Sequence, residues 1–213
     1  MCFNSNDLIR KIYHDGVNFL NPIREIIKLR FLNDEITMQM CYNISVCLDL
    51  LCNSRIMVFL DKFDEKSQKE VFPLCKSFKS VNSDLMNNYL VNKEFLTIDD
   101  SDGKMKNISI STNKRLFDTL LYNLMVNAYR HGRSMEINIS DNLIIIRNEL
   151  INIGERYSSV FEFPVKTDRF GVSGSGLGLK VVRRIAEKLG IKITSSIAKK
   201  NISVTINYDH IVV

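Results

Sequence analysis

The chain of 213 residues has only three histidines, and neither these nor its five cysteines are arranged as a metal site. Its five cysteines form no CxxC pair, and no Cys/His cluster has the spacing of a zinc site. Three of them, Cys41, Cys47 and Cys52, have apolar neighbours within one stretch. We expect these three to be small buried hydrophobic residues in a reducing compartment.

Signals for export and for membrane insertion are also missing. The first residues, MCFNSNDLIRK, include an early Asp and no apolar core, which is unlike a signal peptide. No apolar run approaches the roughly 20 residues of a membrane span. The sequence also contains no internal repeat and no Pro-rich linker. We therefore expect a cytoplasmic protein with no membrane sensor of its own.

The positive charge of the chain is modest and unevenly distributed. The formal net charge is +5, and residues 1–60 contribute nothing to it, because they hold six Lys/Arg and six Asp/Glu. The excess over residues 61–213 favours a polyphosphate ligand or an acidic partner. It lacks the clustered basic footprint that is typical of nucleic-acid binding. The length and the hydrophobic content of 45% indicate one large or two small globular domains.

The first 60 residues predict an antiparallel helical hairpin, because two stretches repeat apolar residues at 3-4 spacing. NDE at 33–35 would be the turn and the N-cap of the second helix. Two hairpins would pair into a four-helix dimer; the alternative is a hairpin packed on the rest of the chain. The predicted domains are 1–62 and 63–213. The two seams are Ile9, Ile12, Gly16, Phe19, Ile23 and Ile26, and Cys41, Ile44, Leu48, Leu51, Arg55 and Val58.

The rest of the chain predicts an α+β fold, an α/β sandwich with helices on one face of a mixed sheet. We expect a polar helix over about 64–90, then two strands, EFLTIDD and KNISISTN, around the turn DDSDG. A helix over 115–132 would end at Gly132, and two strands would follow in MEINISDNLIIIRNE. A long loop over 148–175, the helix LGLKVVRRIAEKLG with a second Gly stop, and a closing hairpin complete the order.

Two motifs carry the chemistry. GVSGSGLGL at 171–179 precedes and enters a helix, where glycines let the backbone approach a phosphate and free N–H groups can bind it. It is not a P-loop. In NLMVNAYRHG, Asn123 and Asn127 share one helix face, and Arg130 and His131 follow one turn later. An amide oxygen suits Mg²⁺, and Arg130 can neutralise phosphate charge. The alternative is a set of solvated polar positions on a surface helix.

These motifs resemble the histidine-kinase/Hsp90-type (GHKL) ATPase superfamily. NLMVNAYRHG is similar to its N box, GSGLGL to its G2 box, and FEFP at 161–164 to its F box. The hairpin resembles the dimerisation and phosphotransfer domain of histidine kinases, in which HDGVN matches the motif H-[DE]-x-x-[NT]. CLDLLCNSRI at 47–56 is similar to the close of that domain's second helix. The resemblance covers nearly the whole chain.

The resemblance implies a role for each matching residue. His14 would accept the phosphoryl group, Asp15 would be its base, and Asn18 would position water or an acyl phosphate. Asn127 would be the principal Mg²⁺ ligand, and Asn123 a supporting one. Glycines 174, 176 and 178 would form the hinge of the ATP lid. The implied nucleotide-binding residues are Asn123, Asn127, Arg130, His131, Asn148, Gly174, Gly176, Leu177 and Gly178.

The sequence departs from the family pattern at the G1 box, D-x-G-x-G. Asn148 stands at the Asp position and Leu150 at the first Gly position, while Phe19 replaces the usual Pro after the His motif and Pro22 follows. Three interpretations stay open. The first is a homodimeric kinase that uses ATP and Mg²⁺ and passes phosphate to a response-regulator receiver domain. The second is a stand-alone histidine phosphotransferase, supplied through a receiver by an upstream phosphodonor kinase. The third is a non-catalytic binding scaffold.

Overall fold

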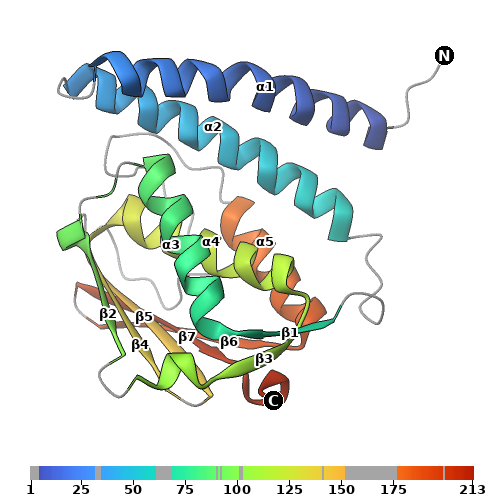
Figure 1. Ribbon diagram of the computed structural model, residues 1–213, viewed down its shortest axis with the longest axis vertical. Helices are drawn as coiled ribbons and strands as arrows, with labels where there is room; N and C mark the ends of the chain where they lie inside the picture. Colours follow the sequence, from blue (N-terminus) through green and yellow to red (C-terminus); the bar gives the residue numbers. More distant parts are fainter. Residues whose placement is uncertain are drawn as a thin grey trace.

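The computed structural model describes residues 5–31, 35–60, 69–89, 91, 93–100, 103–140, 142–151, 177–198 and 200–213. Two long helices, α1 (Ser5–Phe31) and α2 (Glu35–Leu60), form the predicted antiparallel hairpin (Figure 1). Gly16 lies on its seam, because a Cβ there would stand 2.6 Å from Leu51 Cδ1. The proposed turn residues Asn33 and Asp34 lie outside the described residues.

One part of the predicted α1 seam faces away from α2. Ile12, Phe19 and Ile26 are 52%, 68% and 53% exposed. These residues are seven positions apart, so they lie along one stripe of the helix. We call Ile12, Phe19 and Ile26 the outer stripe. The inner face of α1 includes Gly16 and Ile23, which are partly buried.

The hairpin packs on the rest of the chain through α2, and the predicted four-helix dimer stays a prediction. α2 lies between α1 and the helices below it and contacts α3 (Leu74–Tyr89) and α5 (Leu177–Leu189) (Figure 1). Tyr42, Val46 and Leu60 of α2 are buried in the common core. The prediction that the α2 cysteines are all buried is wrong for Cys47, which is exposed.

The expectation that no segment is apolar enough to span a membrane is wrong for α2 by length and composition. Ile36–Leu60 contains an 18-residue window of mean hydropathy 1.4, although scattered Thr, Asn and Ser interrupt every apolar run. Such a helix is weak evidence of a span, since core helices of soluble proteins have the same character. Only 28% of the window is buried within the chain. α2 therefore has both a packed face and an accessible apolar face.

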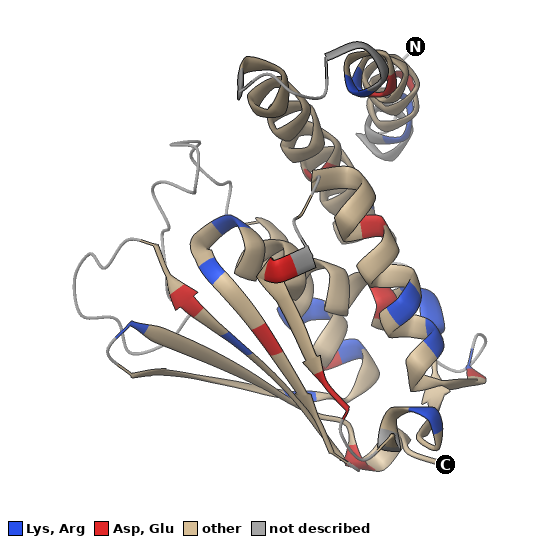
Figure 2. Cartoon of the chain, turned by 60° about the vertical axis from the view of Figure 1, so that its left-hand side comes forward, with Lys and Arg blue, Asp and Glu red and all other residues tan. Residues whose placement is uncertain are grey.

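A five-stranded sheet has the order β2-β4-β5-β7-β6. β2 is parallel to β4, and the other pairs are antiparallel. The three shorter helices cover one face of the sheet (Figure 1), and Figure 2 shows charged residues along the strands. Arg147 of β5 and Glu136 of β4 form an ion pair at 3.9 Å. The strands are β2 (Leu96–Asp99), β4 (Gly132–Ile139), β5 (Leu143–Leu150), β6 (Lys192–Ala198) and β7 (Asn201–Asn207).

A second, two-stranded sheet corrects two sequence predictions. β1 (Glu70–Pro73) occupies a stretch that we expected to be helical, and it pairs with β3 (Ser109–Thr112). The strands on either side of DDSDG are therefore not partners of each other, since β2 joins the large sheet. Four residues are too few for a periodic signal, which explains why β1 was missed.

The ends of the remaining helices follow local chemistry. α4 (Lys114–His131) begins after Asn113, whose Oδ1 accepts from the Leu116 N–H at 2.9 Å. α5 ends before Gly190, whose φ of +66° is the left-handed geometry that glycine tolerates, as predicted. Gly132 ends α4 with an extended φ of −110° instead. The predicted loop begins later than residue 148, because β5 runs to Leu150, and residues 152–176 lie outside the described residues.

Candidate nucleotide-binding site

The structure brings the predicted N box against the start of α5. Asn123 of α4 is 7% exposed, and its Nδ2 donates to the Thr119 carbonyl at 2.9 Å. Its Oδ1 lies 3.0 Å from the position that a Cβ on Gly178 would occupy. Glycine at 178 thus permits a close approach of α5 to Asn123. Two motifs that are distant in the sequence meet at this point.

Asn127 lies one turn beyond Asn123 on α4 and is partly exposed. Its amide has no hydrogen-bond partner among the residues that the structure describes. An accessible amide oxygen of this kind fits Mg²⁺, which also takes phosphate oxygens and water. His131 and Leu177 are both partly buried, at the end of α4 and at the start of α5. No cluster of three or more His, Cys, Asp or Glu suited to a metal occurs in the described part of the chain.

Asn148 lies on β5 beside the C-terminal end of α4. It is 7% exposed, and its Nδ2 stands 2.8 Å from the Cβ position of Gly132. Gly132 is therefore required for this close approach rather than for a left-handed turn. Within the described residues the Asn148 amide has no hydrogen-bond partner, so it is available to a ligand. A ligand that presents both a donor and an acceptor, such as an adenine edge, would satisfy it.

The family pattern has a glycine where this chain has Leu150. It is partly buried in β5, where it pairs with Gly132, and its N–H donates to the Lys200 carbonyl at 2.8 Å. The chain is thus held in a strand at this point. Gly174, Gly176 and the F-box segment 161–164 lie outside the described residues, so their roles stay predictions.

Arg130 is directed toward the hairpin. Its Nε donates to the Tyr42 hydroxyl of α2 at 3.2 Å. Tyr42 in turn packs edge-to-face on Tyr89, with ring centroids 5.6 Å apart. The role of Arg130 beside phosphates, which the resemblance implies, stays a prediction.

Asp49 of α2 links the hairpin to α3 and α4. Tyr122, the residue before Asn123, donates to its Oδ1 at 3.1 Å, and Tyr89 at the end of α3 donates to its Oδ2. Burial raises the pKa of Asp49 to about 6, although both hydroxyl donors and the nearby Arg130 and Arg24 act in the opposite direction. Burial beside Asp49 also raises the pKa of both tyrosines, so they remain donors near neutral pH.

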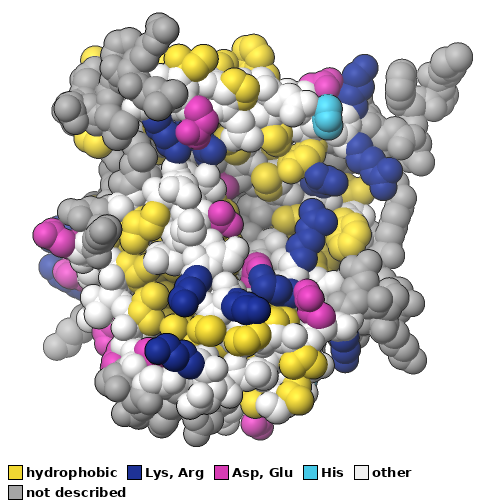
Figure 3. Space-filling model, viewed as in Figure 1, with side chains coloured by type: hydrophobic (Ala, Val, Ile, Leu, Met, Phe, Trp, Pro, Cys, Tyr) yellow, Lys and Arg dark blue, Asp and Glu magenta, His cyan; other side chains and the backbone are white. Residues whose placement is uncertain are grey.

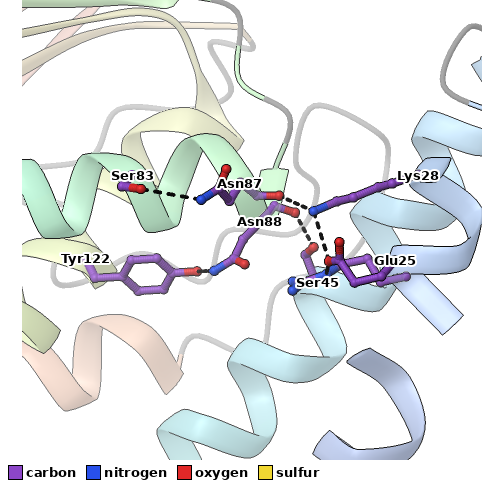
Figure 4. Close-up of polar contacts among 8 residues, drawn as sticks. Glu25, Lys28, Ser45, Ser83, Asn87, Asn88 and Tyr122 are labelled. Carbon is purple, nitrogen blue, oxygen red and sulfur yellow. Dashed lines mark hydrogen bonds and ion pairs between the residues drawn. The ribbon is translucent and has the colours of Figure 1, made fainter. Parts of the chain in front are cut away.

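A second group of polar contacts joins the hairpin to the end of α3. Lys28 donates to the Asn87 carbonyl and also contacts Glu25 at 3.2 Å, and Ser45 donates to the Asn88 carbonyl (Figure 4). The Asn88 Nδ2 donates to the Tyr122 hydroxyl at 3.1 Å. Both helices of the hairpin therefore bond to the helical layer beneath them.

A cleft of about 580 Å³ lies between the hairpin and helices α3 and α4. Figure 3 shows it as a hollow between the hairpin and the helices below, with basic side chains along one side. It reaches from Tyr13 and Val17 of α1 to Asn123 of the N box. Its α2 lining includes Asn53 and Arg55, and Arg55 stacks on the Tyr13 ring at 4.4 Å.

His14, next to Tyr13, has the exposed position that the sequence predicts, with 75% of its side chain accessible. Asn18 lies one turn later, and its Nδ2 is 3.0 Å from His14 Nδ1. Asp15 Oδ1 is 3.6 Å from the same nitrogen, which is an ion-pair distance rather than a hydrogen bond. When Asn18 donates to Nδ1, the neutral ring carries its proton on Nε2.

Comparisons with known proteins agree with this geometry. Residues 112–210 match the family described as histidine kinase-, DNA gyrase B- and HSP90-like ATPase. The histidine kinase AdeS of Acinetobacter baumannii has a similar structure, with a TM-score of 0.53 and 18% identity over 91% of this chain and 95% of that chain. The chain has the fold of histidine kinase catalytic cores, and its residues 112–210 match the GHKL-type ATPase family.

Two further solved structures support the same fold. The cytoplasmic segment of histidine kinase QseC has a TM-score of 0.51 and 15% identity, over 83% of this chain and 96% of that one. Full-length ShkA in complex with AMPPNP has a TM-score of 0.56 and 12% identity; the match covers 96% of this chain and 46% of ShkA. No curated protein sequence matches the chain.

The sequence did not point to the α2 residues that face α3, α4 and α5. Tyr42, Asp49 and Asn53 are polar residues at i, i+7 and i+11, so they lie on one face of the helix. Their spacing within an otherwise apolar helix is the signal that could have found them. It would have indicated that this face of the hairpin meets a partner surface rather than water.

Proposed function

We propose that the protein phosphorylates itself on His14 with ATP and then passes the phosphoryl group to an Asp of a response-regulator receiver domain. The observation that supports this most is the row of three amides along α4, from Asn148 beside Gly132 at its C-terminal end, through Asn127, to Asn123 beside Gly178 at the start of α5. The cleft that begins at Asn123 ends at Tyr13, beside the exposed His14.

In this proposal the residues divide the work of positioning a nucleotide. Asn148 bonds the adenine edge, and Gly174, Gly176, Leu177 and Gly178 let the backbone approach the phosphates. Mg²⁺ held by Asn127, with Asn123 in support, would neutralise charge that develops on the phosphates. Arg130 and His131 would lie near the same phosphates.

The chemical step needs a rearrangement at His14. Its Nε2 attacks the γ-phosphorus in line, the N–P bond forms as the bond to the β–γ bridging oxygen breaks, and ADP leaves. In the reactive tautomer the ring proton is on Nδ1 and Nε2 carries the attacking lone pair. As the N–P bond forms, the Nδ1 proton passes to Asp15. Because Asn18 donates to Nδ1 in the structure, the amide must turn its oxygen toward Nδ1 to favour the reactive tautomer.

The proposed partners use the accessible side of the hairpin. The outer stripe of α1 and the accessible apolar face of α2 would pair with a second copy, giving a four-helix homodimer. A receiver domain would dock beside His14. We place both reactions in the cytoplasm.

A second candidate function is an ATP-independent histidine phosphotransferase. Two observations favour it: Leu150 holds the G1 segment in a strand, and Arg130 bonds the hairpin at Tyr42. In this case His14 would receive phosphate from one receiver domain, charged by an upstream phosphodonor kinase, and pass it to another. A non-catalytic scaffold is the third outcome.

Incubation with ATP labelled on the γ-phosphate distinguishes the candidates. An acid-labile, alkali-stable label on the wild type that is lost in His14→Gln supports the kinase. The matched control is His210→Gln, an exposed histidine far along the chain, which should label like the wild type. Label gained only from a phosphorylated receiver supports the phosphotransferase, and no label in either assay refutes both.

A further inference from the structure

A buried amide from the hairpin lies at the edge of the nucleotide site. Asn53 of α2 is 7% exposed. Its Nδ2 lies 3.9 Å from the Cβ position of Gly178, and the Asn123 Oδ1 lies 3.0 Å from the same point. One residue from each of α2, α4 and α5 therefore meets there.

Asn53 has no hydrogen-bond partner among the described residues, in contrast to its polar neighbours on α2. The Ser54 hydroxyl donates to the Leu50 carbonyl at 2.8 Å, and Asp49 accepts from two tyrosines. An amide without a protein partner can donate to a ligand and accept from it. Asn53 lines the cleft, so a molecule in the cleft can reach it.

The order of the amides along α4 gives the direction of the nucleotide. Asn148 lies beside the C-terminal end of α4, and Asn127 and Asn123 follow toward its N-terminus at one-turn intervals of about 5.4 Å. With adenine at Asn148, the phosphate chain extends past Asn127 to Asn123. Its terminal group then lies between the first residues of α5 and Asn53, at the entrance of the cleft.

We propose that Asn53 is a nucleotide-site residue supplied by the hairpin, whose amide N–H donates to the terminal phosphate of a bound nucleoside triphosphate. This inference rests on the proposed ATP-binding function. A diphosphate lacks the terminal group, so Asn53 would distinguish ATP from ADP. It would also couple ATP binding to docking of α2 on the ATPase domain.

The test compares the affinities of a non-hydrolysable ATP analogue and of ADP, each with Mg²⁺, by titration calorimetry on the full chain. Asn53→Ala removes one hydrogen bond to a charged group, so the analogue should bind about 10- to 100-fold more weakly and ADP within about twofold of the wild type. Asn53→Asp keeps the shape, removes the donor and adds negative charge. It should lose at least as much affinity for the analogue.

Asn43→Ala is the matched control, because Asn43 is an exposed asparagine on the same helix. It should leave both affinities unchanged. A purely structural role for Asn53 would weaken both nucleotides equally, and that result overturns the inference, as does an unchanged ratio in both Asn53 variants. If the wild type binds neither nucleotide, the proposed function fails together with it. If the wild type binds the analogue and the ratio does not change, this inference alone fails.

Discussion

Replacement of Asp49 by asparagine should change how the stability of the protein depends on pH. Burial raises the pKa of Asp49 from an ordinary 3.8 to about 6 in the folded chain. The folded state therefore binds the proton more tightly than the unfolded state does. The resulting stabilisation is complete below the unfolded pKa and is lost as the pH rises through the folded pKa.

The magnitude follows from the size of the pKa change. A rise from 3.8 to about 6 corresponds to about 3 kcal/mol, most of which is lost between about pH 4 and pH 7. The Asp49→Asn variant has no ionisable group at this position, so its free energy of unfolding lacks this component. The new amide oxygen can still accept one tyrosine hydroxyl, but the amide nitrogen cannot accept the other, which costs about 1 kcal/mol at every pH.

The assay is urea unfolding of the wild type and Asp49→Asn at fixed protein concentration, in buffers between about pH 4 and pH 8. The unfolding free energy of the wild type should fall by about 2–3 kcal/mol relative to that of the variant across that range. Asp209→Asn, at an exposed carboxyl, is the control and should follow the wild type within about 0.5 kcal/mol. A constant difference between wild type and Asp49→Asn would refute the reasoning. It would mean that Arg130 and Arg24 offset the burial of the carboxylate.

Three further substitutions test the fold and the assembly. Gly190→Ala should lower the unfolding free energy by about 1–2 kcal/mol in urea titrations, because alanine is strained at a φ of +66°, and an unchanged midpoint would contradict this. Asn113→Ala removes the N-cap of α4 and should cost about 1 kcal/mol in the same assay; a loss below about 0.3 kcal/mol would show that the cap does not stabilise α4. Phe19→Glu should convert the proposed dimer to monomer in light scattering with an unchanged circular dichroism spectrum, whereas Val71→Glu, at an exposed residue outside the outer stripe, should stay dimeric. A wild type that is already monomeric would exclude the dimer.

Periodic and glycine-bounded segments of the fold could be predicted from sequence. α5 and the β6–β7 hairpin were found because the helix has one apolar face and Gly190 ends it. β4 and β5 were found because they alternate buried and exposed residues around a short turn. β1 could not be found, because a four-residue strand acquires its identity from its partner β3. The pairing of β2 with β4 also depends on tertiary contacts.

The same division holds for the site. The N box and Gly178 could be proposed from local chemistry, an amide or the lack of a side chain at one position of a helix. The structure brings Asn123 and Gly178 together, and their roles toward a nucleotide stay predictions. The bond from Arg130 to Tyr42 was not predicted, because it joins two helices that are distant in sequence. The apolar seam of α1 was ambiguous for a related reason. A heptad pattern indicates that a stripe of the helix is apolar, but it does not indicate which partner covers that stripe.

The contacts between α2 and the N box bear on two questions: whether the protein binds ATP, and whether Arg130 or Asn53 bonds its phosphates. Docking of α2 directs Arg130 to Tyr42 and brings Asn53 beside Gly178. In the proposed ATP complex the docked hairpin would hold Arg130 away from the phosphates and would supply the Asn53 amide to them. If the terminal phosphate bonds Asn53, ATP stabilises the docked hairpin; if Arg130 is the stronger phosphate ligand, ATP must break its bond to Tyr42. The effect of Tyr42→Phe on ATP affinity separates these cases. It should be within about twofold in the first case, and it should raise affinity by about fivefold or more in the second, since one hydrogen bond worth about 1 kcal/mol no longer competes.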